Sequence, residues 1–542
     1  DGSSLTVSIT GSSGGNYEQL DTSSKVTTEV ADTVDTTTVT LSSATNGQTV
    51  TEGGSIVYTA SVSNPVTGSP LTVTLSNGVV ITIPVGSSSA NSEPVPVRAD
   101  DAYQQGNETL SVSISGISGG NYESVTTAGS VSNTVVDDSD VTTVTLRGPG
   151  SVVEGEATAA YTVTLSNAAP VGSIVTLSYT YTTASGADIT ETTQAVIGAD
   201  GKTAMFSIAT LVDSTYEGNE IFEVSVSGIQ VPAGTLGFEK LDLSDAKIKT
   251  IITDDADRPT LAVSNAGDVN EGSNAVFNVS LSNATEAPLV INLGLVYGTA
   301  EAADLGTMTV TYVDGNGQTQ TLTVATNGDV TVPAGVTSLT VTVATTQDSV
   351  YEGDETFSLK VTEAGGVTTN GSTGVTGNAT IVDDGSVTPP GGTPDDDRPT
   401  LSVTDAGEVS EGSNAVFTVG LTHATEAPLT INLGLDLGTA EAGDLGTLTV
   451  TYVDSNGATQ TLTVDGDGNV TVPAGVTSLT VTVATTQDSV YEGPETFSLK
   501  VTEAGGVTTN GSTGVTGNAT IVDDGSVTPP GGTPDDDRPT LS

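Results

Sequence analysis

Residues 332–364 read VPAGVTSLTVTVATTQDSVYEGDETFSLKVTEA, a stretch in which two alternating runs flank an acidic turn. In SLTVTVAT and in ETFSLKVT every second residue is apolar, which is the pattern of a strand with one buried face. The apolar and β-branched residues of these runs are those that favour strands. The stretch therefore predicts two half-buried antiparallel strands.

Similar runs recur along the chain, such as GSIVYTASVSN at residues 54–64 and AVFNVSLSNA at residues 275–284. Turns rich in Gly and Asn separate them, and no segment has a sustained helical period. Short strands at regular spacing in units of this size are typical of β-sandwiches. We therefore expect an all-β protein, a tandem array of immunoglobulin-like antiparallel β-sandwiches.

The chain is built from repeats. Residues 258–397 recur almost letter for letter as residues 398–537, and both copies end in a Pro/Gly linker. The sequence of a near-identical repeat cannot be adapted to one unique position, as a catalytic centre usually is. The leading interpretation is therefore that the repeats serve to extend and space other parts of the protein. The predicted domains are residues 1–35 (the C-terminal part of a repeat), 36–140, 141–257, 258–397, 398–537 and 538–542 (the start of the next repeat).

Composition excludes several classes of function. The chain has 66 Asp and Glu against 12 Lys and Arg, a formal net charge of -54, so nucleic acid and anionic membranes would repel it. No Cys is present, which excludes disulfides and thiolate metal sites. No apolar stretch is long enough to insert this segment into a membrane. Ser and Thr lack a recurring His partner, so we expect no enzyme.

Acidic residues recur at fixed places in the repeats. In residues 258–397 a Glu-Gly pair follows the first strand, an Asp lies in GTAEAADLG, a cluster occupies DSVYEGDETF and the repeat closes at IVDD. Because a sandwich gathers its loops at two ends, these acids can converge at one pole. Packed carboxylates repel unless a hard cation intervenes, and Ca2+ accepts roughly six to eight oxygen ligands. The alternative, acids that only solubilise loops, does not require a fixed register.

These motifs resemble the Calx-beta family along nearly all of residues 258–537, with less complete agreement in residues 141–257. The resemblance implies two-sheet sandwiches that bind clustered calcium ions at one end through these acids. The implied metal ligands are Glu154, Asp188, Asp213, Glu217, Glu220, Asp254 and Asp255, then Glu271, Asp304, Asp348, Glu352, Glu355, Asp383 and Asp384, then Glu411, Asp444, Asp488, Glu492, Glu495, Asp523 and Asp524.

Some positions depart from the family pattern. Gln347 and Gly385 stand where further Asp residues are expected, so one or two ions per repeat are expected rather than four. Residues 36–140 have Gln104 in place of a ligand Glu and no evident loop Asp, which predicts a lower calcium affinity. The ligands that remain there are Glu52, Asp100, Glu108, Asp137 and Asp138.

The sequence of residues 1–140, including TEGGSIVYTASVSNPVTGSPLTVTLSNG, resembles repeat units of very large Lap-type bacterial biofilm adhesins exported by type I secretion. This resemblance implies an extracellular segment at the bacterial cell surface. Its role would be that of an extender, whose calcium-rigidified repeats project a distal adhesive domain and contact adjacent repeats of the same chain. The alternative is that the repeats themselves bind surface polysaccharide or another copy of the adhesin.

The junctions between repeats differ in length. VVDDSDVTTV and ITDDADRPTL leave one or two residues between acidic strand end and next strand, so one ion can bridge the two repeats. In contrast, GSVTPPGGTP at residues 385–394 separates VDD from DDDRPT. Pro and Gly predict a semi-rigid tether here. We expect the two acidic ends of this tether to lie too far apart for one ion to contact both.

Overall fold

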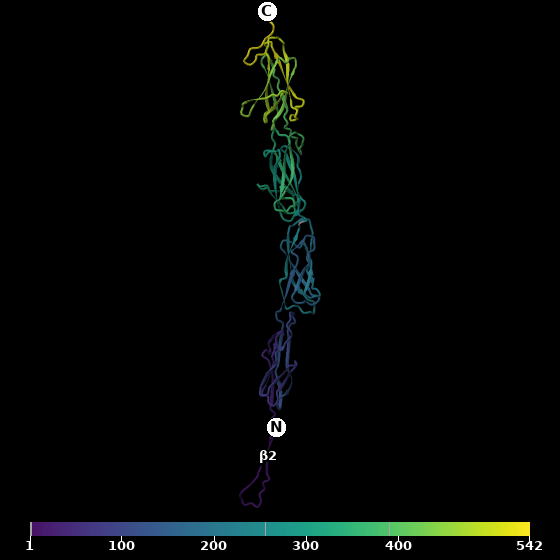
Figure 1. The fold of residues 1–542 in the computed structure, drawn as a ribbon, viewed down its shortest axis with the longest axis vertical. Helices are drawn as coiled ribbons and strands as arrows, with labels where there is room; N and C mark the ends of the chain where they lie inside the picture. Colours follow the sequence, from purple (N-terminus) through teal and green to yellow (C-terminus); the bar gives the residue numbers. More distant parts are fainter. Residues whose placement is uncertain (1–2, 255, 390, 542) are drawn as a thin grey trace. The chain divides into compact units, whose positions relative to one another are not determined.

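The computed structural model describes residues 3–254, 256–389 and 391–541, and all regular secondary structure in these ranges is β-strand. The strands form sandwiches that follow one another in chain order (Figure 1). Residues 36–140, 141–257, 258–397 and 398–537 are called the first to fourth repeats below, and each has its own hydrophobic core. No helix in the described ranges is long and apolar enough to cross a bilayer.

The chain divides into two units, of which the first comprises residues 1–212 and 219–253. Its strands are β1 (Ser3–Ser8), β2 (Lys25–Val30), β3 (Thr36–Ser42), β4 (Thr49–Thr51), β5 (Ser55–Ile56), β6 (Thr59–Val62), β7 (Leu71–Leu75), β8 (Val80–Ile83), β9 (Ser89–Asn91), β10 (Val95–Pro96), β11 (Glu108–Gly119), β12 (Ser124–Ala128), β13 (Ser130–Val136), β14 (Val141–Arg147), β15 (Ser151–Val153), β16 (Tyr161–Leu165), β17 (Ile174–Tyr181), β18 (Ile189–Thr190), β19 (Gln194–Val196), β20 (Thr203–Phe206), β21 (Ala209–Thr210), β23 (Glu220–Gln230), β24 (Lys240–Asp245) and β25 (Lys247–Thr253).

The second unit comprises residues 213–218 and 254–542. Its strands are β22 (Thr215–Tyr216), β26 (Leu261–Val263), β27 (Gly267–Asn270), β28 (Asn274–Leu281), β29 (Ala284–Thr285), β30 (Leu289–Tyr297), β31 (Leu305–Val313), β32 (Thr319–Leu322), β33 (Asp329–Val332), β34 (Ser338–Thr345), β35 (Val350–Tyr351), β36 (Glu355–Thr362), β37 (Val375–Val382), β38 (Leu401–Val403), β39 (Gly407–Ser410), β40 (Asn414–Leu421), β41 (Ala424–Thr425), β42 (Leu429–Leu437), β43 (Leu445–Val453), β44 (Thr459–Leu462), β45 (Asn469–Val472), β46 (Ser478–Thr485), β47 (Glu495–Thr502) and β48 (Val515–Val522).

Each repeat packs one sheet on another. In the first repeat the sheet β4-β13-β11-β7-β8 packs on the sheet β12-β3-β6-β9. In the second repeat the sheet β20-β16-β14-β24 packs on the sheet β15-β25-β23-β17-β19. The third repeat pairs β26-β28-β34-β31-β32 with β27-β37-β36-β30-β33. The fourth repeats this order as β38-β40-β46-β43-β44 and β39-β48-β47-β42-β45. The expected all-β array of sandwiches is therefore confirmed.

Alternation along each strand builds the core. In β34 the side chains of Leu339, Val341 and Val343 are buried while the residues between them are not. Between the sheets, Phe277 of β28 meets Phe357 of β36 with ring centroids 6.0 Å apart in an edge-to-face contact. Such pairs contribute about 0.5–1.5 kcal/mol beyond the area they bury. The two sheets are thus joined by side chains of the same alternating runs that predict them.

The hairpin of β1 and β2 shows what a strand pair lacks without a second sheet. It has the register of β11 and β13, since Val7 lies opposite Val26 as Val112 lies opposite Val131. Val112 and Val131 are buried, whereas Val7 and Val26 are 61% and 68% exposed. Backbone pairing alone therefore forms the hairpin, and burial of its apolar face requires the other strands of a sandwich.

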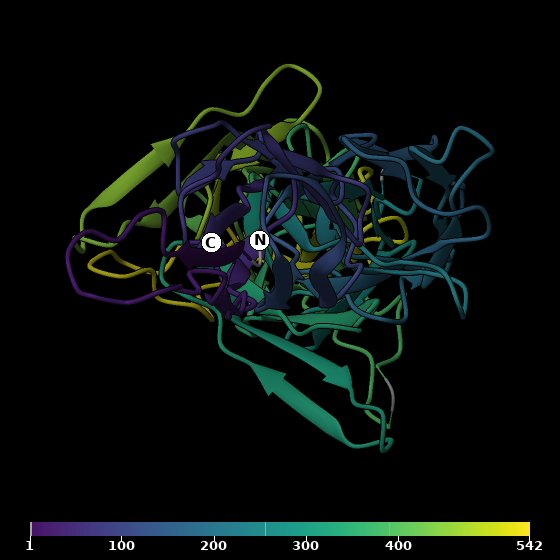
Figure 2. The ribbon, with the colours of Figure 1, turned by 90° about the horizontal axis from the view of Figure 1, so that it is seen from below.

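The third and fourth repeats each extend one sheet into a projecting hairpin, formed by β31 with β32 and by β43 with β44 (Figure 2). In each repeat the first strand of this hairpin also pairs with the central strand β34 or β46. The hairpin is therefore anchored at its base, beside the sandwich.

We expect Phe277→Ala to lower the free energy of unfolding of the third repeat by about 3–5 kcal/mol, because it leaves a cavity between the two sheets. Hydrogen exchange in β28 would report this loss. The fourth repeat is the internal control. Its β40 peptide NAVFTVGL differs in mass from the β28 peptide NAVFNVSL, so the exchange of the two strands can be measured separately. Unchanged exchange in β28 would contradict the proposed role of the aromatic pair.

Candidate metal centre

Strand pairing brings the acids of the third repeat to one end of the sandwich. β27 pairs in parallel with β37, so Glu271 and Asp383 leave their strands at the same edge. Glu355 opens β36 opposite Ile381 of β37. In the other sheet Leu305 lies opposite Thr345, which places Asp304 at the end where β34 enters the acidic turn. Residues distant in sequence thus meet at one acidic pole.

Backbone amides hold several of these carboxylates in place. Glu271 Oε1 accepts a hydrogen bond from the amide of Asp348 at 3.0 Å, and Asp383 Oδ2 accepts one from Glu352 at 2.9 Å. Asp348 Oδ1 accepts a hydrogen bond from the amide of Val350 at 2.7 Å, which shapes the acidic turn. The turn is therefore fastened through carboxylate oxygens to the ends of β27 and β37, two neighbouring strands of one sheet.

The remaining oxygens of the buried acids have no hydrogen-bond partner. Glu271, Glu355 and Asp383 are at most 6% exposed, yet Glu271 Oε2, Glu355 Oε2 and Asp383 Oδ1 are unsatisfied. A buried polar atom without a partner costs free energy, and a buried charge costs far more. Such oxygens are the ligands that hard cations take, so the donor set fits calcium.

Burial and mutual repulsion raise the pKa values of these carboxyl groups. Burial, together with the charges of Asp348 and Asp395, raises the pKa of Glu271 to about 8. Burial and the neighbouring carboxyl of Asp304 raise the pKa of Glu355 to about 8. Burial likewise raises the pKa of Asp383 to about 6. Without a cation, the pole therefore favours protons on its acids.

The Pro/Gly linker returns to the pole, contrary to our expectation of a spacer that separates its acidic ends. Asp384 forms a β-bridge with Asp396, and the amide of Asp397 donates to the carbonyl of Asp383 at 2.9 Å. Carboxylate oxygens of Glu271, Asp395 and Asp397 lie within 4.8 Å of one another. The prediction was wrong because these backbone hydrogen bonds close the linker into a loop, which its composition does not reveal.

Asp395 and Asp397 are therefore candidate ligands that the sequence reasoning missed. Their signal was present, because acids stand just before the next strand at the short junctions as well. Asp384, in contrast, accepts a hydrogen bond from the amide of Ser386 at 2.8 Å, which ties it to the linker turn. The side chain of Ser386, together with this amide, lowers the pKa of Asp384. Glu352 stays with the pole, where burial and nearby carboxylates raise its pKa to about 7.

The fourth repeat reproduces this arrangement. Glu411 Oε1 accepts a hydrogen bond from the amide of Asp488 at 2.8 Å, and Asp523 Oδ2 accepts one from Glu492 at 2.7 Å. Asp523 Oδ1 is buried without a partner, as in the third repeat. Asp524 binds its own turn through Ser526. One pocket is lined by Glu411, Asp444, Glu492, Gly493, Glu495, Ile521 and Asp523.

In the second repeat the predicted ligands stand at strand ends. Glu220 and Asp254 are buried, and Asp254 Oδ2 accepts a hydrogen bond from the amide of Glu217 at 2.7 Å. Asp255 lies outside the described residues. The others are Glu154 after β15, Asp188 before β18 and Asp213 before β22.

The first repeat differs, because a guanidinium group lies among its acids. Arg98 Nε donates to Glu52 Oε2 at 2.9 Å, and its Nη2 donates to Asp137 Oδ1. Glu239 of the second repeat also approaches, and its Oε2 accepts a hydrogen bond from the amide of Asp140 at 2.9 Å. Sequence motifs indicated neither Arg98 nor Glu239.

The other predicted ligands of the first repeat lie further out. Asp100 and Asp138 are exposed, although each offers an oxygen near Glu52 in one acidic group. Glu108 opens β11 and is exposed. Their exposure distinguishes them from Glu271, Glu355 and Asp383 of the third repeat, which are buried.

Comparisons with known proteins agree with this architecture. The model of the Calx-beta domain family matches residues 137–257, 268–385 and 442–525, which together are more than half of the chain. The chain belongs to the Calx-beta domain family. The model of the LapA domain family matches residues 35–139, the first repeat. Both matched families are repeat domains rather than enzyme families. No curated protein matches the chain.

Three solved structures are among those that the chain matches. CBD12 from CALX1.2 has 12% identity and a TM-score of 0.19, covering 44% of this chain and 99% of that one. The apo form of the Calx CBD1 domain has 19% identity and a TM-score of 0.18, covering 21% and 99%. Cadherin-like domains 1 to 4 of zebrafish RET have 10% identity and a TM-score of 0.20, covering 88% and 99%.

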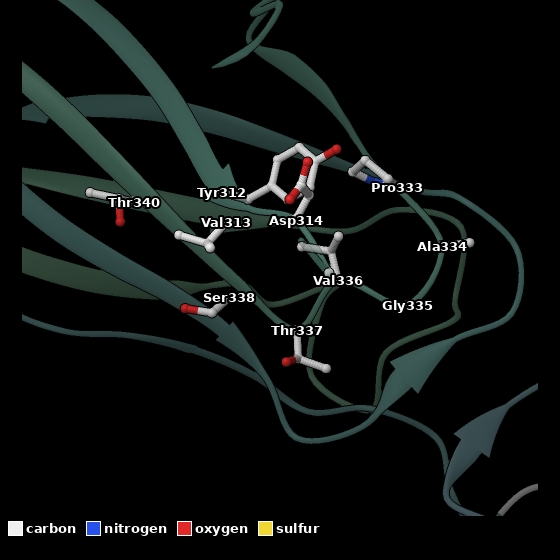
Figure 3. A pocket seen from close by; sticks show the side chains of 11 residues that line it. Tyr312, Val313, Asp314, Pro333, Ala334, Gly335, Val336, Thr337, Ser338 and Thr340 are labelled. Atoms are coloured by element: carbon white, nitrogen blue, oxygen red, sulfur yellow. The ribbon is translucent and has the colours of Figure 1, made fainter. Parts of the chain in front are cut away.

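A separate open groove lies away from the acids of the third Calx-beta repeat. Tyr312 and Asp314, at the end of β31, face the loop that contains Pro333 and Val336 (Figure 3). β31 starts beside Asp304, so the groove is at the opposite end of that strand from the acidic pole. The fourth repeat has the same groove around Tyr452 and Pro473.

In chelator, we expect the free energy of unfolding of the third Calx-beta repeat to fall as pH rises from about 5 to about 8. The folded pKa of Glu271 is raised above its unfolded value. Its stabilising contribution is therefore full below the unfolded pKa, near 4.3, and is lost as pH rises through about 8. Hydrogen exchange in β28, corrected for its intrinsic pH dependence, measures the change.

Two variants test the cause. Glu271→Gln keeps a neutral group at the pole and should reduce the pH dependence, whereas Asp268→Asn, which makes the same charge change on an exposed strand position, should not. A third repeat that is equally stable at both pH values in chelator would contradict the prediction.

Proposed function

We propose that this chain is an extender segment of a bacterial surface adhesin. Calcium would stiffen the repeats by binding the carboxylates of their acidic poles and holding the loops there together. The observation that carries the proposal is the set of buried, unpartnered carboxylate oxygens on Glu271, Glu355, Asp383 and Asp523. Both near-identical repeats place such oxygens at the same end of the sandwich. The match to LapA and Calx-beta domains supports the adhesin setting.

The donor chemistry favours calcium over other common metals. The pole offers only oxygen ligands, whereas structural zinc sites use Cys and His, and the chain has no Cys and one His. Mg2+ demands a nearly ideal octahedron and keeps several waters, while Ca2+ accepts irregular sets of carboxylate and carbonyl oxygens. Acids contributed by several loops and by the returning linker form such an irregular set.

Calcium would act on stability and not on catalysis. A ligand that binds only the folded state, at about 1,000 times its Kd, stabilises that state by about 4 kcal/mol. Each repeat is small, so this gain is a large part of its total stability. Repeats that are loose in low calcium and firm in high calcium would suit a segment that must extend only outside the cell.

The direct test compares full-length chain in calcium and in chelator. We expect the melting transition of the third and fourth repeats to rise by many degrees in calcium. Asp383→Asn with Asp523→Asn should remove most of that rise, because each removes a charge from a buried oxygen pair. Asp268→Asn with Glu408→Gln is the matched control at exposed positions. A melting temperature that calcium does not move would refute calcium binding at the poles.

A second candidate function is binding of polysaccharide by the repeats. The recurrence of an open groove beside Tyr312 and Tyr452 favours it, since aromatic rings with a polar tip suit sugar surfaces. We expect binding of the isolated chain to a surface polysaccharide to fall at least tenfold in Tyr312→Ala with Tyr452→Ala. Binding that persists unchanged in this double variant, or no binding by the parent chain, would exclude the groove as the site.

A further inference from the structure

Arg98 stands at a position where the other repeats have no cation. Counting back five residues from the tyrosine of the acidic turn gives Arg98 before Tyr103. The same count gives Leu211, Thr346 and Thr486 in the second, third and fourth repeats. The first repeat therefore carries a permanent positive charge at a place that is neutral in its relatives.

The guanidinium group of Arg98 is enclosed and makes three contacts. Nε donates to Glu52 Oε2 at 2.9 Å, Nη1 donates to the carbonyl of Gly106 at 2.6 Å and Nη2 donates to Asp137 Oδ1. The Arg98 side chain is 13% exposed, and that of Glu52 is fully buried. The planar fork thus joins the end of β13, the turn after β4 and the acidic turn.

Comparison of Asp137 with Asp383 and Asp523 shows what this fork replaces. In all three, Oδ2 accepts a hydrogen bond from a backbone amide of the acidic turn, at 2.7 to 2.9 Å. The other oxygen differs between repeats. Asp137 Oδ1 is bound by Arg98, whereas Asp383 Oδ1 and Asp523 Oδ1 are buried without a partner. The guanidinium therefore satisfies the oxygen that is left unsatisfied in the later repeats.

The glutamate after the first short strand has a different partner in the two repeats. Glu52 Oε2 is paired with Arg98 and Glu271 Oε1 with the amide of Asp348, and each glutamate keeps one buried oxygen without a partner, Glu52 Oε1 and Glu271 Oε2. Charge-assisted bonds from a planar guanidinium fit carboxylates well and need no metal. Arg is also charged at every physiological pH, so this compensation does not depend on the supply of an ion.

We propose that the guanidinium group of Arg98 takes the place of a calcium ion beside Glu52 and Asp137. The loops at the acidic pole of the first repeat are then held together without metal. This inference rests on the proposed function, because it assigns calcium to the unpartnered oxygens of the later repeats. The exposed acids Asp100 and Asp138, near Glu52 Oε1, lie outside the contacts of Arg98 and are not needed for this compensation. The array then combines one repeat whose acidic pole is held together by Arg98 with repeats whose poles are held together by calcium.

Hydrogen exchange on the full-length chain, in calcium and in chelator, tests the proposal repeat by repeat. Peptides covering the acidic turns are distinguishable, since the third repeat has Asp354 where the fourth has Pro494. For the later turns we expect exchange up to about a thousandfold faster in chelator, the factor that saturating calcium contributes. For residues 99–109 of the parent chain we expect rates within about twofold in the two conditions, because opening there is not linked to calcium.

Arg98→Thr installs the residue found in the third and fourth repeats. We expect its turn to open in chelator and to close again in calcium. Arg98→Lys, which keeps the charge but loses the fork, should give an intermediate response in chelator. Arg147→Thr removes an equal charge from the exposed pair with Asp245, and should leave the first turn unchanged.

The outcomes distinguish calcium binding by the later repeats from the role of Arg98 in the first repeat. If no turn responds to calcium, the proposed function fails. If the later turns respond and residues 99–109 of the parent chain respond equally, the role of Arg98 is wrong while calcium binding stands. A first turn that stays closed in chelator in Arg98→Thr, or stays open in calcium, would also overturn the substitution of guanidinium for calcium.

Discussion

The structure of each pole depends on how buried carboxylates are compensated. Two parallel short strands, such as β27 beside β37, end at the same edge and deliver Glu271 and Asp383 into a space with little water. One oxygen of each acid is used to fasten the acidic turn, which commits the group to this buried position. The second oxygen then requires a proton, a metal ion or a positively charged side chain. Loop conformation at this end follows from which of these is present.

Core and pole are built from different residues of a repeat. The core is made by alternating apolar residues, with Phe277 against Phe357 across the sheets, and it contains none of the acids. Hydrophobic burial does not depend on a metal, so the sandwich topology is retained whichever cation compensates the pole. This separation lets Arg98 compensate Asp137 in the first repeat while Asp383 and Asp523 keep an unpartnered oxygen in the third and fourth, with the same kind of two-sheet core beneath.

The linker between the third and fourth repeats belongs to the pole. Asp395 and Asp397 return beside Glu271, held by the bridge between Asp384 and Asp396. A segment that composition marks as a spacer is thereby coupled to the same cation balance as the acidic turn. In the first unit Glu239 of the second repeat reaches the acids of the first in a comparable way. Under the proposed function, ion binding would order these connecting residues together with the loops.

The sequence by itself determined the all-β fold, the repeat pattern and the acids that recur in register, because alternation and repetition are local properties of the chain. It also predicted that Glu271 and Asp383 would meet, since strand ends of one sandwich gather at its poles. Only the tertiary structure decided that Asp395 and Asp397 return to that pole, that Glu239 joins the first, and that Arg98 pairs with Glu52 and Asp137. These contacts join segments tens of residues apart through single side chains and loop hydrogen bonds. Such contacts leave no periodic trace in the sequence, and three-dimensional packing alone selects them.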